Sequence, residues 1–445
     1  MRPLSLALGL PACLCVLVLA ACQPEIVPGP YVPTDAHDAY RHSLVASGLG
    51  ETALGRDWQE AGESALRSPI DIDAPFKETI YVDATRAFAT TYRFSVVRGQ
   101  RTEIQLSLQP TSDWRIYLDL FREPDPPDTS HVHVASGGEG DLRLAFEPRR
   151  DGRYVLRLHS ELLRGGSCTI EIRNVASLDF PVAGHDTSSI GSAFGAEREA
   201  GRREHHGVDI FAKRHTDVLA TSRARVRRVD EWKLGGNIIW LEDPERNLRL
   251  YFAHLQTQDV EEGAWVEAGE RIGTVGNSGN ARTTSPHLHF GIYVRGEGPI
   301  DPHPFLRQPS REPRDVRVRL DHLGQWLRTK RERVVLRPNP GGEPPLDEIP
   351  RHTPLFIAGG SSHSYRVVTP SGLVGYVAEN ETESLTESVA ELALVTTTPV
   401  LDRPTSDGAV VREVAAGTTL DVLARYADYV WVDSDARRPA WVLSP

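Results

Sequence analysis

The sequence is short of positive charge, of cysteine and of long apolar segments. Its 445 residues include 50 Lys and Arg against 61 Asp and Glu, and this net charge of -11 excludes a general nucleic-acid binder. An apolar share of 40% and a charged share of 25% are ordinary for globular proteins, and they exclude a disordered or polytopic membrane chain. Only one of the four cysteines, Cys168, lies beyond the N-terminal segment. We therefore expect no intramolecular disulfide.

One apolar run does occur at the N-terminus, from Leu4 to Ala21, after a single positive charge. This pattern predicts an export signal, and the run is too short for a confident spanning helix. Its end, Leu19-Ala20-Ala21-Cys22, resembles the bacterial lipoprotein box, in which the mature chain starts at a lipidated cysteine. The resemblance implies a signal peptide over 1–21 and lipidation of Cys22, and Gln23 after the cysteine favours the outer membrane. An ordinary cleaved signal is the alternative.

The composition changes along the chain, and the length alone suggests about three domains. Residues 22–36 are rich in proline and lack periodicity, as is typical of a tether. Residues 37–67 are predicted to be helical, because apolar side chains recur at steps of three or four. Over residues 68–176 apolar and polar residues alternate in at least five segments, with turn residues between them. This alternation indicates a β-sandwich accessory domain.

The C-terminal part contains an internal repeat. Residues 331–385 and 390–445 share motifs at matching positions, among them Tyr365-Arg366-Val367 and Val430-Trp431-Val432. Each unit is predicted to consist of short strands, and the pair resembles tandem bacterial Src-homology-3-like barrels. Such barrels commonly bind cell-wall peptides, and a role as folded spacers is the alternative. Residues 309–330, which are polar and rich in arginine, are predicted to be a linker.

The clearest chemistry lies in residues 177–308. His287 and His289 are two apart in a segment typical of a strand, so both imidazoles would face one side. If the chain from His205 to Asp209 is also extended, these two residues share a face, and the glycine between them leaves space. An imidazole and a carboxylate from one strand plus an imidazole from another form the three-ligand site of a catalytic zinc. A fourth position remains for a water molecule, whose pKa such an ion lowers to about 7.

Further motifs surround these residues: Ser192-Ala193-Phe194-Gly195, Tyr251-Phe252-Ala253-His254-Leu255, a series of glycines, and Ser285-Pro286-His287-Leu288-His289-Phe290-Gly291. In this order they closely resemble the lysostaphin/LytM-type zinc metallopeptidases, over about residues 190–305. The resemblance implies a small, mostly antiparallel β-sheet domain with a metal groove across it.

The resemblance also assigns a role to each of five residues. It implies that His205, Asp209 and His289 bind zinc, one ion per chain. It implies that His287 acts as the general base, and that His254 stabilises the oxyanion or moves protons. These residue types suit peptide hydrolysis, because an imidazole titrates near neutral pH and can act first as base and then as acid.

Other histidines lack this context. His131 and His133 are also two apart, but they fall in a predicted loop of the sandwich without a neighbouring carboxylate motif, so we interpret them as structural or solvated. His206 is expected on the opposite strand face from the ligands. His215 and His303 match no role in the family.

Two turns after the predicted aspartate ligand depart from the family pattern. The family usually has a Gly-Thr-Pro-Val turn and then an Asp-Gly turn, where this chain has Arg214-His215-Thr216-Asp217-Val218 and Arg223-Ala224-Arg225-Val226. We expect the lost glycines to force other backbone geometry, because a glycine at positive φ is not freely replaced. The predicted ligands are untouched, so we expect activity to survive in a groove of altered shape.

The predicted fold class is mainly β and multidomain: a short helical N-terminal region, a β-sandwich, a small antiparallel β-sheet zinc peptidase domain and two small β-barrels. The resemblance implies an endopeptidase that cuts peptide cross-links of peptidoglycan, above all D-alanyl–diaminopimelyl bonds, at the cell envelope facing the periplasm. The alternative is a non-catalytic regulator or adaptor that activates a wall amidase. Such relatives lack one or more of the five residues, and all five are present here. The expected partners are peptidoglycan, a membrane through the lipid anchor, and a regulatory protein in the alternative.

Overall fold

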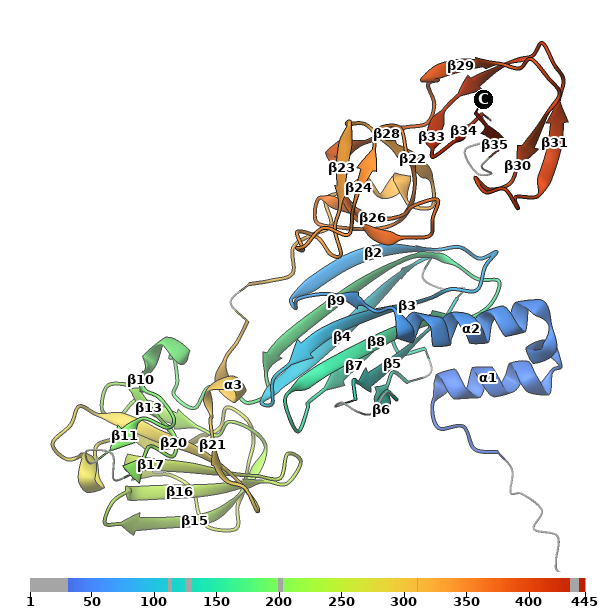
Figure 1. Ribbon diagram of the computed structural model, residues 1–445. Coiled ribbons are helices and arrows are strands. Elements are labelled where there is room, and N and C mark those ends of the chain that lie inside the picture. Colours follow the sequence, from blue (N-terminus) through green and yellow to red (C-terminus); the bar gives the residue numbers. More distant parts are fainter. Residues whose placement is uncertain are drawn as a thin grey trace, which may run out of the picture.

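The computed structural model describes residues 31–110, 114–124, 130–138, 140–198, 203–309, 311–432 and 440–444. Strands form most of its regular structure and helices are few, so the prediction of a mainly β protein is confirmed (Figure 1). The predicted signal peptide, the lipidation site Cys22 and most of the tether lie outside the described residues. Within those residues, no helix combines the length and the apolar character needed to cross a membrane.

Two short helices lie at the N-terminal side of the described chain. They are α1 (Ala36–Ala46) and α2 (Ala53–Arg67), joined by the 3-10 turn η1 (Leu49–Glu51). The side chains of Asp35 and Thr52 cap them by accepting hydrogen bonds from backbone N–H groups of the first turn. Trp58 of α2 is buried, and its indole N–H donates to the backbone carbonyl of Ser160 at 2.7 Å. This contact fastens the helices to the sheets that follow.

Two sheets then face each other and form a sandwich. One has the strand order β1-β3-β8-β5-β6, and the other contains the run β2-β9-β4-β7. Their strands are β1 (Ile70–Asp71), β2 (Phe76–Val82), β3 (Ala89–Val96), β4 (Gln100–Gln109), β5 (Ile116–Arg122), β6 (Val132–Ser136), β7 (Arg143–Phe146), β8 (Gly152–Ser160) and β9 (Gly166–Ala176). Because residues two apart share a face, the alternating apolar side chains build one core between the sheets. Cys168 lies in this core as a free, buried thiol.

A separate sheet follows and carries the candidate site. Its main path has the order β10-β13-β20-β17-β16-β15-β18, with β14, β19 and β21 paired beside it and β11 and β12 forming a hairpin of their own. Its strands are β10 (Ile190–Ser192), β11 (Glu197–Arg198), β12 (Arg203–Glu204), β13 (Val208–Phe211), β14 (Asp217–Leu219), β15 (Ala224–Trp232), β16 (Gly236–Asp243), β17 (Leu248–Gln258), β18 (Trp265–Val266), β19 (Arg271–Val275), β20 (His287–Val294) and β21 (Gly298–Ile300). Three short helical turns accompany them: η2 (Thr187–Ser189), η3 (Gly279–Ala281) and α3 (His303–Leu306). Apolar side chains on one face, such as Val208, Phe252 and Phe290, pack into a core and leave the opposite face for polar groups.

The first C-terminal unit comprises β22 to β28 and shares a sheet with the sandwich. β25 pairs with β2, which extends one sheet to nine strands. The elements of the unit are η4 (Leu320–His322), β22 (Trp326–Thr329), β23 (Arg333–Leu336), β24 (Asp347–Pro350), β25 (Pro354–Ser361), β26 (Ser364–Val368), β27 (Val374–Ala378), η5 (Glu379–Glu381) and β28 (Thr382–Ser384). Since β22 pairs with β25 and β28, the unit includes residues that the composition assigned to a linker over 309–330. The prediction of a linker is therefore wrong for β22, because this strand is stabilised by pairing with distant strands, which the polar composition of the segment does not reveal.

The second C-terminal unit comprises β29 to β35 and has a core of its own. Its strands are β29 (Ala390–Ala393), β30 (Thr398–Leu401), β31 (Val410–Val414), β32 (Thr419–Val422), β33 (Ala424–Tyr426), β34 (Tyr429–Trp431) and β35 (Trp441–Leu443). In Figure 1 this unit and the sheet with the candidate site lie at opposite ends of the molecule, with the sandwich and the first C-terminal unit between them.

Candidate metal centre and groove

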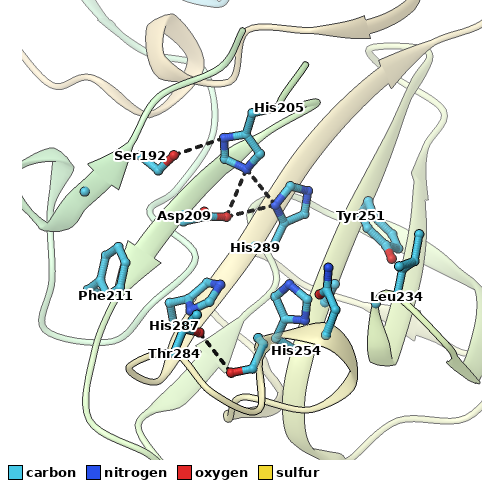
Figure 2. A pocket seen from close by; sticks show the side chains of 15 residues that line it. Ser192, His205, Asp209, Phe211, Leu234, Tyr251, His254, Thr284, His287 and His289 are labelled. Atoms are coloured by element: carbon cyan, nitrogen blue, oxygen red, sulfur yellow. Dashed lines mark hydrogen bonds and ion pairs between the residues drawn. The ribbon is translucent and has the colours of Figure 1, made fainter. Parts of the chain in front are cut away.

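Strand pairing brings three of the predicted site residues together. In the pairing of β13 with β20, Asp209 lies opposite His289 and Phe211 lies opposite His287. Opposite residues of an antiparallel pair share a face, as do residues two apart, so Asp209, His287 and His289 face the same side. His205 precedes β13 outside any strand, and its ring nevertheless reaches the same place (Figure 2).

Three potential ligand atoms converge there. Nε2 of His205 is 3.0 Å from Oδ1 of Asp209 and 3.0 Å from Nδ1 of His289, and the last two atoms are 2.9 Å apart. Ligand atoms bound at about 2.0–2.1 Å from a tetrahedral zinc lie about 3.3 Å from one another, so a small outward movement suffices to accept the ion. Two imidazole nitrogens and a carboxylate oxygen are also a donor set that zinc prefers. The residues therefore fit a zinc ion.

Two further features favour metal binding by the rings of His205 and His289. Nδ1 of His205 donates a hydrogen bond to the backbone carbonyl of Ala193 at 2.8 Å. A carbonyl can only accept, so the proton of the neutral ring is on Nδ1 and the lone pair on Nε2 points toward Asp209. Gly207 leaves room for His289, because a Cβ at this position would lie 2.9 Å from Cε1 and Nε2 of that ring.

The other two histidines of the site have matching hydrogen bonds. Nδ1 of His287 donates to the backbone carbonyl of Ser285 at 2.9 Å, and Nδ1 of His254 donates to that of Ser278 at 3.0 Å. In each neutral ring Nε2 is then the free proton acceptor. The His254 and His287 ring centroids are 5.0 Å apart, edge to face.

A bulge places His254 in the groove. Strict alternation along β17 would put it on the face opposite its neighbour Ala253, which lies across from His289. The register between β16 and β17 shifts at this point, and His254 adopts a left-handed φ of 62°. Bulges re-aim side chains in this way, and strained backbone of this kind gathers at functional sites.

Burial and neighbouring groups set the charges. Burial raises the pKa of Asp209, but the contacts with His205 and His289 outweigh it and hold that pKa below its ordinary value. Burial lowers the pKa of His289, and burial together with the nearby His287 and His289 rings lowers the pKa of His254 to about 4. Near neutral pH Asp209 is thus an anionic carboxylate and the ring of His289 is neutral, the forms that bind metals.

All five residues line one groove with a volume of about 490 Å³. Its walls include residues to which the sequence assigned no role, such as Leu234 from the turn between β15 and β16, Thr284 from the loop before β20, and Tyr251 from β17. Figure 2 shows their side chains around the histidines. A loop residue carries no local pattern that marks it as a groove wall, because its position depends on the strands that it connects.

The remaining histidines lie apart from this groove. His206 is exposed. His133 belongs to strand β6, so the loop predicted there is wrong: β6 gains its order by pairing with β5 at the edge of the sheet.

Atoms of His133, Asp119 and Asp35 also come close enough to surround an ion. However, Asp119 already pairs with the guanidinium of Arg157 at 2.6 Å, which makes a second metal centre unnecessary to balance its charge.

One of the two altered turns keeps a glycine-like backbone. His215 adopts a left-handed φ of 69°, the region that favours glycine. The expectation of other backbone geometry is therefore wrong at this turn. The backbone N–H of His215 donates to the carbonyl of Val275 at 2.9 Å, and this bond helps to hold the conformation. At the second turn Ala224 lies fully buried in β15, and its φ is not positive.

Residues 203–302 match the model of Peptidase family M23, whose members are zinc metallopeptidases. The chain contains an M23 peptidase domain. It is 37% identical over 139 residues to the L-Ala–D-Glu endopeptidase of Bacillus subtilis, a match that covers 29% of this chain and 42% of the relative. It is 32% identical over 94 residues to the peptidoglycan DD-endopeptidase ShyC of Vibrio cholerae, covering 21% of each. It is 34% identical over 116 residues to the murein hydrolase activator NlpD of Escherichia coli, covering 26% of this chain and 28% of the relative. The match spans less than half the length of each of these relatives, so the M23 domain is the shared part.

Proposed function

We propose that this protein is a zinc-dependent endopeptidase that hydrolyses peptide cross-links of peptidoglycan. The single observation that carries the proposal is the convergence of His205, Asp209 and His289 in one groove, beside two further imidazoles that each keep a free nitrogen. A spent or vestigial site would not be expected to keep a full set of ligands and proton acceptors.

The residues divide into ligands and proton carriers. His205, Asp209 and His289 would hold one zinc ion, which when bound supplies a Lewis acid for the scissile carbonyl and an acidified water as nucleophile. His287 is the proposed general base, since its Nε2 is the acceptor that remains after Nδ1 donates to Ser285. Nδ1 of His254 donates in the same way, so Nε2 of the neutral ring is its remaining polar atom, and the proposed role of this ring is to stabilise the oxyanion or to move protons.

The names of the relatives support peptidoglycan as the substrate, and the D-alanyl–diaminopimelyl bond is the one we propose. We also propose that the chain is anchored by a lipid at Cys22 in the outer membrane and faces the periplasm. The proposed domain limits, with the peptidase at 177–308, the first repeat extended before residue 331 to include β22, and the second repeat at 390–445, would then place the groove at a distance from the wall-binding or spacer units.

The second candidate function is activation of a wall amidase without catalysis. It is favoured by the 34% identity to the murein hydrolase activator NlpD. A regulatory protein would be the partner in that case. The presence of all five predicted site residues favours the enzyme over the activator.

The test uses cross-linked sacculi and the chain without residues 1–22. We expect cross-linked muropeptide dimers to decrease and monomers to increase, as measured by mass spectrometry, and we expect a chelator or His287→Ala to stop this. His206→Ala, which changes an exposed neighbour of the site, should leave turnover unchanged. Intact dimers from a protein with one bound zinc per chain would refute this substrate. Intact dimers without bound zinc would refute the enzyme, and addition of a wall amidase would then test the activator.

A further inference from the structure

The groove face of the M23 sheet continues past the candidate metal centre as a surface of aromatic rings. Gly291 and Tyr293 follow His289 along β20 at steps of two and therefore share its face. Tyr251 of β17 lies opposite Gly291 on one side and opposite Trp240 of β16 on the other. The ring centroids of Tyr251 and Trp240 are 4.6 Å apart, and those of Trp240 and Tyr293 are 5.1 Å apart.

We call this surface the aromatic platform and define it by Trp232, Trp240, Tyr251 and Tyr293. Trp232 ends β15, and its ring centroid is 6.2 Å from that of Tyr251. Three of the four rings line a shallow hollow of about 270 Å³. Trp232 is 39% exposed. Trp240 and Tyr293 are partly exposed, whereas Tyr251 is 9% exposed and belongs to a small buried apolar cluster on which these two rings pack. Trp232, Trp240 and Tyr293 thus remain open to a ligand.

Arginines surround the rings. Arg227, Arg228 and Arg249 line the same hollow. Arg227 is paired with Glu242 at 2.9 Å. Arg249 is exposed and has no ion-pair partner within the described residues. The hollow therefore combines flat apolar surfaces with N–H donors at its edge.

The platform begins inside the candidate active-site groove. Tyr251 lines that groove, and its ring centroid is 5.8 Å from that of His289. The next step, to Trp240, measures 4.6 Å, so the Trp240 ring lies within about the length of three extended residues of the His289 ring. In peptidoglycan, short stem peptides connect each cross-link to the sugar strand, so a sugar lies a few residues from the bond that is cut.

We propose that the aromatic platform binds the sugar strand of peptidoglycan while the groove holds the adjoining peptide, an inference that rests on the proposed function. A pyranose ring has an apolar face of C–H groups that packs on an aromatic ring, and it carries hydroxyl and acetamide oxygens that accept from arginine N–H groups. The hollow offers both kinds of contact side by side. The stem peptide, with its carboxylates, would need a surplus of free cations, whereas Arg227 and Arg228 are already paired with Glu242 and Asp230, and Arg249 alone adds an unpaired charge among the described residues of the hollow.

The first test measures binding and needs no turnover. The zinc-loaded full chain without its leader is titrated calorimetrically with the β-1,4-linked tetramer of N-acetylglucosamine. We expect Trp240→Ala to weaken binding at least tenfold, and Trp232→Ala, which alters a more exposed ring, to weaken it in the same direction. Trp265→Ala is the matched control, because Trp265 is 47% exposed in the same domain and lies outside the hollow. Binding that is absent in the unsubstituted chain, or equal in all variants, would overturn the proposal.

The second test separates sugar from peptide. Cross-linked muropeptide dimers are compared with the same dimers after an amidase has removed their sugars. For Trp240→Ala we expect KM to rise about tenfold on the sugar-bearing dimers alone, with kcat unchanged. An equal rise on both substrates would show that the platform binds peptide and would overturn the proposal. Lack of turnover of either substrate by the unsubstituted chain would refute the endopeptidase, while the titration would still decide whether the platform binds sugar.

Discussion

Gly207 lies just before β13 and close to strand β20, and replacing it with alanine should disturb the candidate metal centre. A Cβ at this position would lie 2.5 Å from the backbone oxygen of Phe290 and 2.9 Å from two atoms of the His289 ring. Carbon atoms normally pack at about 3.5–4.0 Å, so either the β20 backbone or the ligand ring has to move. The φ of Gly207 is not positive, and alanine meets no backbone strain of its own. The effect expected for Gly207→Ala therefore comes from crowding in the folded protein and not from a left-handed backbone conformation.

The size of the effect follows from these contacts. Overpacking of this kind costs about 1–3 kcal/mol of unfolding free energy, and in a domain of about a hundred residues each kcal/mol lowers Tm by about 4–8 °C. Displacement of a group that orients a ligand typically weakens metal binding about 10–100-fold. We expect Gly207→Ala to show both effects. Zinc affinity is measured by competition with a chromophoric chelator, and Tm by calorimetry of the metal-free protein.

Gly152→Ala is the matched control for this substitution. Gly152 lies in β8 of the sandwich, its φ is not positive, and an added Cβ would have its nearest neighbour, an atom of Tyr154, at 3.5 Å. Zinc affinity should be unchanged in this variant. If Gly207→Ala bound zinc as tightly as the unsubstituted chain, the placement of His289 would not depend on the space at Gly207, and the reasoning would fail.

Three further predictions concern stability. Chelation should lower the Tm of the M23 domain, because zinc at a thousand times its Kd adds about 4.1 kcal/mol to the free energy of unfolding. An unchanged Tm in a protein shown to lose zinc would contradict the proposed metal site. Arg366→Met should cost about 3–5 kcal/mol in denaturant unfolding, because it leaves Glu78, 0% exposed and 3.4 Å from Arg366, as a buried unpaired charge. Arg333→Met, which removes an exposed ion pair, should cost less than about 1 kcal/mol, and equal losses would contradict the argument. Burial lowers the pKa of His37 from 6.5 to about 4. Between these two pH values the folded chain therefore binds fewer protons than the unfolded chain. The free energy of unfolding should fall by up to about 3 kcal/mol as the pH drops from 6.5 to 4. His37→Gln should flatten this dependence in thermal melts across the same pH range, and equal slopes would speak against it.

The alternation of apolar residues was a reliable guide where one strand face is buried. It marked β3, β4, β5, β7 and β8 of the sandwich, whose inward side chains lie in one core. It missed β6, an edge strand with little burial, and it missed β22, whose order comes from pairing with β25 and β28. Both depend on partners far along the chain.

Within the groove, the residue types and the two-residue step of His287 and His289 followed from the sequence, and the roles of the five residues stay predictions. The position of His254 did not follow, because alternation puts it on the wrong face and only the bulge in β17 turns it inward. The glycine-like conformation of His215 was likewise invisible, since the turn is held by a hydrogen bond to Val275.

By itself, then, the sequence determined the mainly β class, the family of the central domain and the residue types of the candidate site, because strand period and side-chain type are local properties of the chain. Only the tertiary structure decided that β2 and β25 join the sandwich to the first C-terminal unit, and that Trp240 and Tyr293 lie in a hollow next to Tyr251 of the groove. These features arise from the register between distant strands. Register depends on which backbone groups find partners across the whole fold, and no local pattern contains that information.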